Sequence, residues 1–264
     1  MKIKKTGITL SLATFNIEWF GKKGYEKDYP MLFGEIKNCD VIGVQEITDP
    51  RLFEQAAGEH LGKSWKFVAT DYPIQKVGLL FNSRNVDPLR FETYENVSLG
   101  HRQRRPGFLG EFVHRKTGFG FEVMVVHLKS GNRKKDIRTR KAQWKVLSKI
   151  IKKLEAAAGN MALLGDMNCF DMDGEHLTEL DAFIQSSGLV LATVGDNYTE
   201  TEKCGGRIDH ILVSPAFAQH LTGVFVGGAC RLDLKSREED SNAYCNAYWE
   251  NVSDHCPVIA AFNI

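Results

Sequence analysis

Residues 161–168 read MALLGDMN, and they combine the two features that organise the whole chain. Met161–Leu164 is a short apolar run, as expected for a strand that is covered on both faces. Asp166 and Asn168 follow this run directly, so polar groups stand where the strand ends. A carboxylate after a strand is usually a turn residue or a helix cap, so this segment alone does not indicate a functional site.

The same arrangement recurs on five further apolar runs along the chain. Polar residues close or interrupt these runs as follows: Asn16 and Glu18 in TFNIEWF, Gln45 and Glu46 in VIGVQE, His127 in FEVMVVHLKS, Asp209 in RIDHILVS, and Asp254 and His255 before the C-terminal run. Strand ends of one sheet sandwich can converge in space, so we expect these side chains to share one pocket.

Short β-rich runs alternate with helical segments from one end of the chain to the other. We expect strands at Thr9–Asn16, Val41–Glu46, Trp65–Thr70, Val77–Phe81, Phe108–His114, Phe121–Leu128, Ala162–Gly165, Ile208–Val213 and Pro257–Phe262. We expect helices at Pro50–Leu61, Lys135–Ala158 and Leu177–Ser187. Gly227–Glu250 has the poorest pattern and is expected to form a long loop. The absence of repeats and linkers favours one α/β domain over residues 1–264.

Composition and charge exclude several classes of protein. The chain has 264 residues, 43% of them hydrophobic, with 34 Lys and Arg against 33 Asp and Glu. Disorder would require low hydrophobicity and high net charge, and neither is present. No apolar run approaches the ~18 residues of a membrane span, so we expect no stable membrane association. The near-neutral charge argues against a protein that coats nucleic acid by bulk electrostatics.

The N-terminus and the cysteines favour a cytoplasmic location. The opening MKIKK resembles the start of a signal peptide, but Thr6–Thr14 is interrupted by Gly and Thr and lacks a cleavage pattern. The six cysteines are Cys39, Cys169, Cys204, Cys230, Cys245 and Cys256. Their wide spacing and the absence of a CxxC pair predict free, buried or half-buried thiols. A secreted protein with disulfides is the alternative.

The residue types at the strand ends indicate hydrolysis of a phosphate ester. Four of them offer hard oxygen ligands: Glu46, Asn16, Glu18 and Asp254. Such ligands suit Mg²⁺ or Mn²⁺ rather than zinc. The two histidines stand near acids, so they can accept a proton or place positive charge near a phosphate oxygen. Because no serine or cysteine lies in a nucleophile motif, water is the expected nucleophile.

The ordered motifs TFNIEWF, QE, VHL, GDMN, RIDHI and SDH resemble those of the endonuclease/exonuclease/phosphatase superfamily, which includes deoxyribonuclease I and exonuclease III. The resemblance runs from about Leu12 to Ala261. It implies a four-layer α-β-β-α sandwich of two packed, mainly antiparallel sheets, with one active site at one edge. All the main motif positions are filled, so we predict an active, metal-dependent phosphodiesterase.

The resemblance also implies residues that hold the metal and the substrate phosphate. Glu46 would be the principal ligand of Mg²⁺ or Mn²⁺. Asn16 and Glu18 would flank it, and Asp254 would contribute. Asn16 would also contact the phosphate. Arg104, in HRQRRP, lies where some deoxyribonuclease-like members carry a phosphate-binding arginine, although an exposed basic loop is an equal alternative.

The remaining motif residues would carry the chemistry. Asp209 and His255 resemble a dyad in which the acid orients an imidazole that activates water. Asp166 would position the nucleophile or assist the leaving oxygen. Asn168 and His127 would hold the phosphate and stabilise its charged transition state.

The substrate is not identified by these motifs, because the superfamily cleaves DNA, RNA, inositol phosphates and sphingomyelin with one set of groups. Eleven basic residues lie between Lys129 and Lys153, with Asp136 the only acid among them. Part of this run directly follows His127 and fits a polyanionic substrate, although a solvated helix surface is the alternative. We expect a nuclease with DNA as its partner and no obligate protein partner. Alternatives are an inositol-phosphate, nucleotide or phospholipid phosphoesterase and a catalytically silent binding member.

Overall fold

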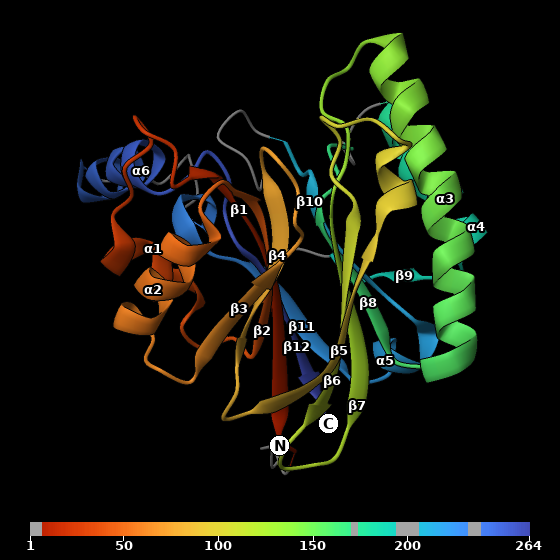
Figure 1. Ribbon diagram of the computed structural model, residues 1–264, viewed down its shortest axis with the longest axis horizontal. Helices are drawn as coiled ribbons and strands as arrows, with labels where there is room; N and C mark the ends of the chain where they lie inside the picture. Colours follow the sequence, from red (N-terminus) through yellow and green to blue (C-terminus); the bar gives the residue numbers. More distant parts are fainter. Residues whose placement is uncertain (1–6, 170–173, 194–205, 232–238) are drawn as a thin grey trace.

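Two six-stranded sheets lie at the centre of the molecule (Figure 1). The computed structural model describes residues 7–169, 174–193, 206–231 and 239–264. Sheet A contains, in spatial order, β11 (Leu221–Val226), β12 (Val258–Asn263), β1 (Thr9–Phe20), β2 (Val41–Ile47), β4 (Lys76–Asn82) and β3 (Trp65–Ala69). Sheet B contains β5 (Val86–Tyr94), β6 (Gly107–His114), β7 (Gly120–His127), β8 (Met161–Asp166), β10 (Asp209–Val213) and β9 (Val190–Leu191).

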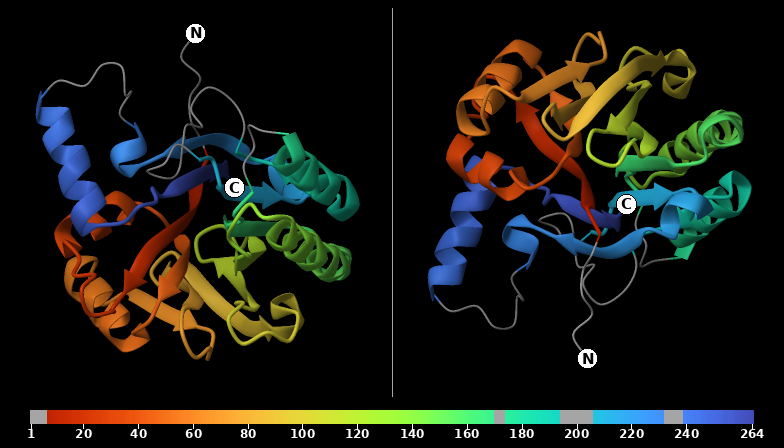
Figure 2. Two further views of the ribbon diagram at one scale, coloured as in Figure 1. Left: turned by 90° about the horizontal axis from the view of Figure 1, so that it is seen from above. Right: turned by 90° about the horizontal axis from the view of Figure 1, so that it is seen from below.

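Helices cover the outer face of each sheet, which completes the expected four layers (Figures 1 and 2). On the side of sheet A lie α1 (Tyr29–Ile36), α2 (Pro50–His60) and α6 (Glu239–Asn251). On the side of sheet B lie α3 (Lys134–Ala158) and α4 (Gly174–Ser187). Shorter turns are η1 (Glu95–Ser98), α5 (Pro215–Ala218) and η2 (Gly228–Arg231). Within the described residues, no helix is both long and apolar enough to cross a membrane.

The sheets are mainly antiparallel, as expected, but each contains one parallel pair. These pairs are β1 with β2 in sheet A and β7 with β8 in sheet B. Parallel neighbours end at the same edge of a sheet, so each pair delivers two strand ends to one place. The two sheets approach closely below that edge, because Gly43 on β2 leaves room for Leu164 on β8. A Cβ at Gly43 would lie 2.1 Å from the Leu164 Cδ1 atom.

The structure differs from the sequence-based expectation in the region 227–250. We expected a long loop there, but η2 and α6 occupy most of its described part. Cys245 and Tyr248 on α6, and Val252 directly after it, are buried at spacings of three and four residues, so the helix packs one apolar face into the core. The three Asn and three acidic residues of the helix conceal this face in the sequence.

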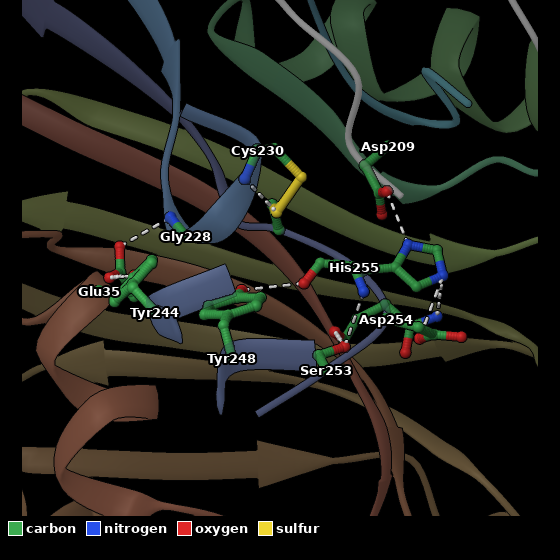
Figure 3. The surroundings of a disulfide bond; sticks show 11 residues. Glu35, Asp209, Gly228, Cys230, Tyr244, Tyr248, Ser253, Asp254 and His255 are labelled. Carbon is green, nitrogen blue, oxygen red and sulfur yellow. Dashed lines mark hydrogen bonds and ion pairs between the residues drawn. A yellow bond between two sulfur atoms is a disulfide. The ribbon is translucent and has the colours of Figure 1, made fainter. Parts of the chain in front are cut away.

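The expectation of free cysteines is wrong for one pair. Cys230 on η2 forms a disulfide with Cys256 (Figure 3), while Cys39 and Cys245 are free and buried, and Cys169 is also buried. Cys204 lies outside the described residues. The wide spacing in sequence concealed this pair, because only the fold brings η2 beside the segment that precedes β12. Disulfides are typical of oxidising compartments, so one argument for a cytoplasmic location is lost.

Candidate active site

Three of the expected site residues lie on one rung of sheet B. In the parallel pair, His127 stands opposite Asp166, and in the antiparallel pair Asp209 stands opposite Asp166 from the other side. All three side chains are buried. The Nε2 atom of His127 lies 3.2 Å from the Oδ2 atom of Asp166. The strand register alone therefore places a histidine and two carboxylates side by side.

In sheet A, irregular backbone at the ends of β1 and β2 brings further polar groups to the site. The register shifts after Asn16 and Gln45, and three nearby residues have positive φ: Glu18 (35°), Trp19 (53°) and Glu46 (64°). Each such conformation costs about 1–3 kcal/mol in a non-glycine residue and persists only where the surroundings enforce it. Here the Glu18 N–H donates to Asn16 Oδ1 at 3.1 Å, and the Trp19 N–H donates to Glu46 Oε2 at 3.2 Å.

Asn16 joins the two halves of the site. Its Nδ2 atom donates to Asp166 Oδ2 at 3.1 Å and to Glu46 Oε1 at 3.5 Å, and lies 3.4 Å from His255 Nε2. The side chain is 1% exposed. Because Asn16 and Glu46 come from sheet A and Asp166 from sheet B, this amide connects the two sheets at their shared edge. The structure thus brings together most of the strand-end residues that we expected to share a pocket, but the Gln45 amide donates instead to the Thr14 hydroxyl and the Gly43 carbonyl, each at 3.1 Å.

His255 is held by contacts at its backbone and at its ring (Figure 3). Its Nδ1 atom lies 2.8 Å from Asp209 Oδ2, its N–H donates to Ser253 Oγ, and its carbonyl accepts a bond from the Tyr248 hydroxyl. The Ser253 hydroxyl in turn donates to the Asn16 carbonyl at 2.7 Å. With the Nδ1 proton directed at Asp209, the Nε2 atom is left to exchange a proton with a reacting group.

The surroundings shift the pKa values of His255 and Asp166 in opposite directions. Burial alone would lower the pKa of His255, but Asp209 and then Asp166 raise it well above its usual value. Burial alone would raise the pKa of Asp166, but His127 and His255 hold it well below its usual range. The Asn168 N–H, donating to Asp166 Oδ1 at 3.0 Å, also favours the ionised carboxylate. Asp166 is therefore a fixed negative charge at the centre of the cluster.

A second group of acids lies beside this cluster. Burial and then the neighbouring charge of Asp254 raise the pKa of Glu18, and burial together with the charge of Glu46 raises the pKa of Asp254. Lys27, which we did not expect here, places its Nζ atom 3.7 Å from Glu18 Oε2 with only 4% of its side chain exposed. Acids that repel one another in a half-buried site have the charge arrangement that a cation would relieve.

These acids have the donor chemistry that suits a divalent metal. Across the described part of the chain, no group of three His, Cys, Asp or Glu side chains is arranged to hold an ion as it stands. The available atoms are nevertheless hard oxygens, which Mg²⁺ and Mn²⁺ prefer. Glu46 uses Oε2 to accept bonds from Gln75 and Trp19, while its Oε1 atom faces the cluster around Asp166. The residues present therefore fit a magnesium or manganese ion.

Arg105, rather than the expected Arg104, stands beside the site. Arg105 Nη2 lies 3.9 Å from Glu46 Oε1 and donates to the Gln75 side chain, and burial lowers the pKa of Arg105 despite the opposing charge of Glu46. The one described contact of Arg104 is a hydrogen bond from its backbone N–H to the His101 carbonyl. The run HRQRRP offers several cations in succession, so sequence could not establish which one turns inward.

One residue of the expected basic surface has a structural task instead. Arg140 is fully buried, where it donates to the carbonyls of Lys129 and Gly131 and forms an ion pair with Glu179 at 3.2 Å. Lys129 is itself paired with Asp136 at 3.2 Å. Arg140 thus fastens the loop that follows His127. The other basic residues of α3 and its leading turn are exposed.

The two packed sheets with helices on their outer faces form the deoxyribonuclease I-like sandwich fold. The model of the endonuclease/exonuclease/phosphatase family matches residues 13–255, and the chain belongs to this family. Members of the family hydrolyse phosphoester bonds and generally use divalent metals. No curated protein sequence matches the chain.

Solved structures share the fold at low sequence identity. An endonuclease/exonuclease/phosphatase family protein from Bacteroides thetaiotaomicron has a TM-score of 0.71 and 18% identity, covering 98% of this chain and 99% of its own. A mannosyl-6-phosphatase from the same species has a TM-score of 0.69 and 19% identity over 95% and 98%. TDP2 from D. rerio, complexed with a single-strand DNA product, has a TM-score of 0.68 and 14% identity over 97% and 99%.

Proposed function

We propose that this protein is a divalent-metal-dependent nuclease that hydrolyses phosphodiester bonds, with DNA as the favoured substrate. The observation that carries the proposal is the buried Asp166 carboxylate, which both histidines and Asn16 face within 3.9 Å. This cluster combines a group that can take a proton, donors for a phosphate oxygen and adjacent hard oxygen ligands. Hydrolysis of a phosphate ester needs each of these.

The metal is assigned to the acid-rich side of the cluster. Four residues would hold Mg²⁺ or Mn²⁺ there: Glu46, Asn16, Glu18 and Asp254. When bound, the ion would supply electrostatic stabilisation of the charge that develops on the phosphoryl oxygens. Arg105 would add a second positive charge on the same side.

We assign His255 as the group that accepts the proton of the attacking water. In the neutral form of the ring, which its raised pKa confines to higher pH, the Nε2 atom accepts a proton from the attacking water, while Asp209 holds the Nδ1 proton and stabilises the imidazolium that forms. Asp166 keeps His127 and Asn16 in place through contacts of 3.2 and 3.1 Å. The His127 ring and the Asn168 amide, one hydrogen of which is donated to the Leu128 carbonyl at 3.3 Å, are assigned as donors to the phosphate.

The preference for nucleic acid is supported by charge near the site. The loop after His127 and the first turns of α3 carry exposed lysines and arginines, and a polyanion is attracted by such a surface. TDP2, which has a similar fold, forms a complex with a single-strand DNA product, and this supports the preference for DNA. A phosphorylated sugar is the competing substrate, given the similarly folded mannosyl-6-phosphatase.

A substrate screen tests the proposal. Plasmid DNA, single-stranded DNA, RNA, an inositol phosphate and bis-p-nitrophenyl phosphate would each be incubated with Mg²⁺ or with EDTA. We expect cleavage of DNA and of the model diester with Mg²⁺ only. Activity that survives EDTA would contradict the metal assignment. Activity confined to the inositol phosphate would contradict the nuclease assignment.

Two variants and one control test the assigned residues. His255→Ala should lower kcat by about 10²–10⁴-fold, because the proton acceptor is lost. Glu46→Gln should raise the Mg²⁺ concentration needed for half-maximal rate. His220→Ala is the matched control, since the side chain of this partly exposed histidine contacts only the Asn263 carbonyl and an adjacent ring in the described contacts. A His255→Ala enzyme as active as this control would refute the mechanism.

A further inference from the structure

A pocket of about 240 Å³ opens beside Glu46. Its lining includes Trp19, Tyr72, Ile74, Gln75, Arg102 and Arg105. Ligand pockets for drug-sized molecules measure about 300–1,000 Å³, so this pocket matches a single ring system rather than a whole nucleotide. Neither the motifs nor the mechanism above assigns it a role.

The pocket shares a wall with the candidate active site. The Trp19 N–H and the Gln75 amide both donate to Glu46 Oε2, at 3.2 and 2.6 Å. Arg105 touches the Gln75 side chain and lies 3.9 Å from Glu46 Oε1. A group that fills the pocket is therefore adjacent to the phosphate that the site would cleave.

The two aromatic rings of the pocket are held in place before any ligand arrives. Trp19 has the left-handed φ of 53° described above, and the Lys22 ammonium lies 3.8 Å from its ring centroid. The centroid of the Tyr25 ring lies 6.2 Å from the centroid of the Trp19 ring. The Tyr72 hydroxyl donates to the His101 carbonyl at 3.0 Å. Rings fixed in this way lose little conformational entropy when a flat group stacks on them.

The lining has the chemistry that recognises a nucleobase. Trp19 and Tyr72 contribute aromatic side chains, and the exposed Ile74 adds apolar surface. Arg102 and Arg105 offer guanidinium groups, which stack on bases or donate to base carbonyl and ring-nitrogen acceptors. The lining contains no carboxylate, so no negative charge within it opposes the approach of a nucleotide.

We propose that this pocket binds the nucleobase next to the scissile phosphate, and that Trp19 and Tyr72 determine specificity for nucleotide substrates. The inference rests on the proposed nuclease function and extends it. It predicts that the enzyme distinguishes phosphodiesters by the presence of a base beside the cleaved bond. Stacking tolerates every base, so little sequence preference is expected.

The test uses three single-stranded DNA oligonucleotides, each with one cleavable phosphodiester among methylphosphonate linkages. One strand is intact, one has an abasic site on the 5′ side of the cleavable bond, and one has it on the 3′ side. Wild-type enzyme should cleave one abasic strand with a kcat/KM about tenfold lower than that of the intact strand. Trp19→Ala and Tyr72→Ala should lose about tenfold on the intact strand while cleaving that abasic strand at the wild-type rate.

Conservative variants and a distant aromatic residue provide the controls. Trp19→Phe and Tyr72→Phe keep a ring and should retain most of the preference for the intact strand. Phe225→Ala removes an exposed aromatic side chain on β11, outside the pocket lining, and should behave as wild type on all three strands. Thermal unfolding of each variant establishes that it is folded.

Two results would overturn the inference in different ways. An active wild-type enzyme that cleaves all three strands equally would refute the nucleobase pocket and leave the nuclease function standing. An enzyme that cleaves neither these strands nor unmodified single-stranded DNA, yet hydrolyses an inositol or sugar phosphate, would refute the nuclease function itself.

Discussion

Removal of the Cys230–Cys256 disulfide should destabilise the protein by an amount that follows from its position in the chain. The bond closes a loop of 26 residues. The chain-entropy relation for disulfides gives about 3.5 kcal/mol for a loop of this length, because the cross-link restricts the unfolded chain. For a urea m-value of about 3 kcal/mol per M, the unfolding midpoint should fall by about 1 M.

The assay is urea unfolding of the wild type and of a Cys230→Ala, Cys256→Ala double variant, each with and without dithiothreitol. The reduced wild type should match the double variant, and the double variant should not respond to the reductant. Cys245→Ala is the matched control, because it removes a buried free thiol and should keep the response to dithiothreitol. If thiol titration shows that the bond is reduced and the wild-type midpoint has not moved, the reasoning is refuted.

Three further changes test the site and its support. Asp209→Asn removes the charge that raises the pKa of His255, so the acid limb of the kcat/KM pH profile should move to lower pH. An unchanged acid limb would contradict the pairing of Asp209 with a catalytic His255. Arg140→Met removes the ion pair of the buried Glu179 and should lower the free energy of unfolding by about 3–5 kcal/mol in urea, whereas the exposed Lys141→Met should stay within about 0.5 kcal/mol. Lys27→Met removes a cation from the acidic side of the site and should lower the Mg²⁺ concentration for half-maximal rate several-fold. A higher concentration would show that Lys27 assists metal binding.

The buried strands were predictable because each is apolar over its length. β2 and β8 fall within one or two residues of the expected ranges. β5 escaped prediction because it is an edge strand, with Leu89 59% exposed and Pro88 beside a register shift. Edge strands carry charged residues and proline, which removes the apolar pattern that identifies a central strand.

The site was predictable where motif residues end strands, and not where the contacts depend on tertiary structure. His127, Asp166 and Asp209 meet because three neighbouring strands bring them to one rung. Lys27 and Arg105 lie in irregular segments, where no periodicity shows which side chain turns inward. Their proximity to the acids is a property of the folded chain that spacing in the sequence does not encode.

The division of the site between two sheets has a consequence for how the protein acquires activity. Each sheet holds about half of the cluster. The acid-rich side comes with sheet A, and the rung that contains Asp166 belongs to sheet B. The groups from the side of sheet A are Asn16, Glu46 and His255, and those from sheet B are His127, Asp166 and Asp209. A refolding intermediate with only one formed sheet would therefore be inactive. The rate at which activity returns during refolding would report the rate at which the two sheets dock.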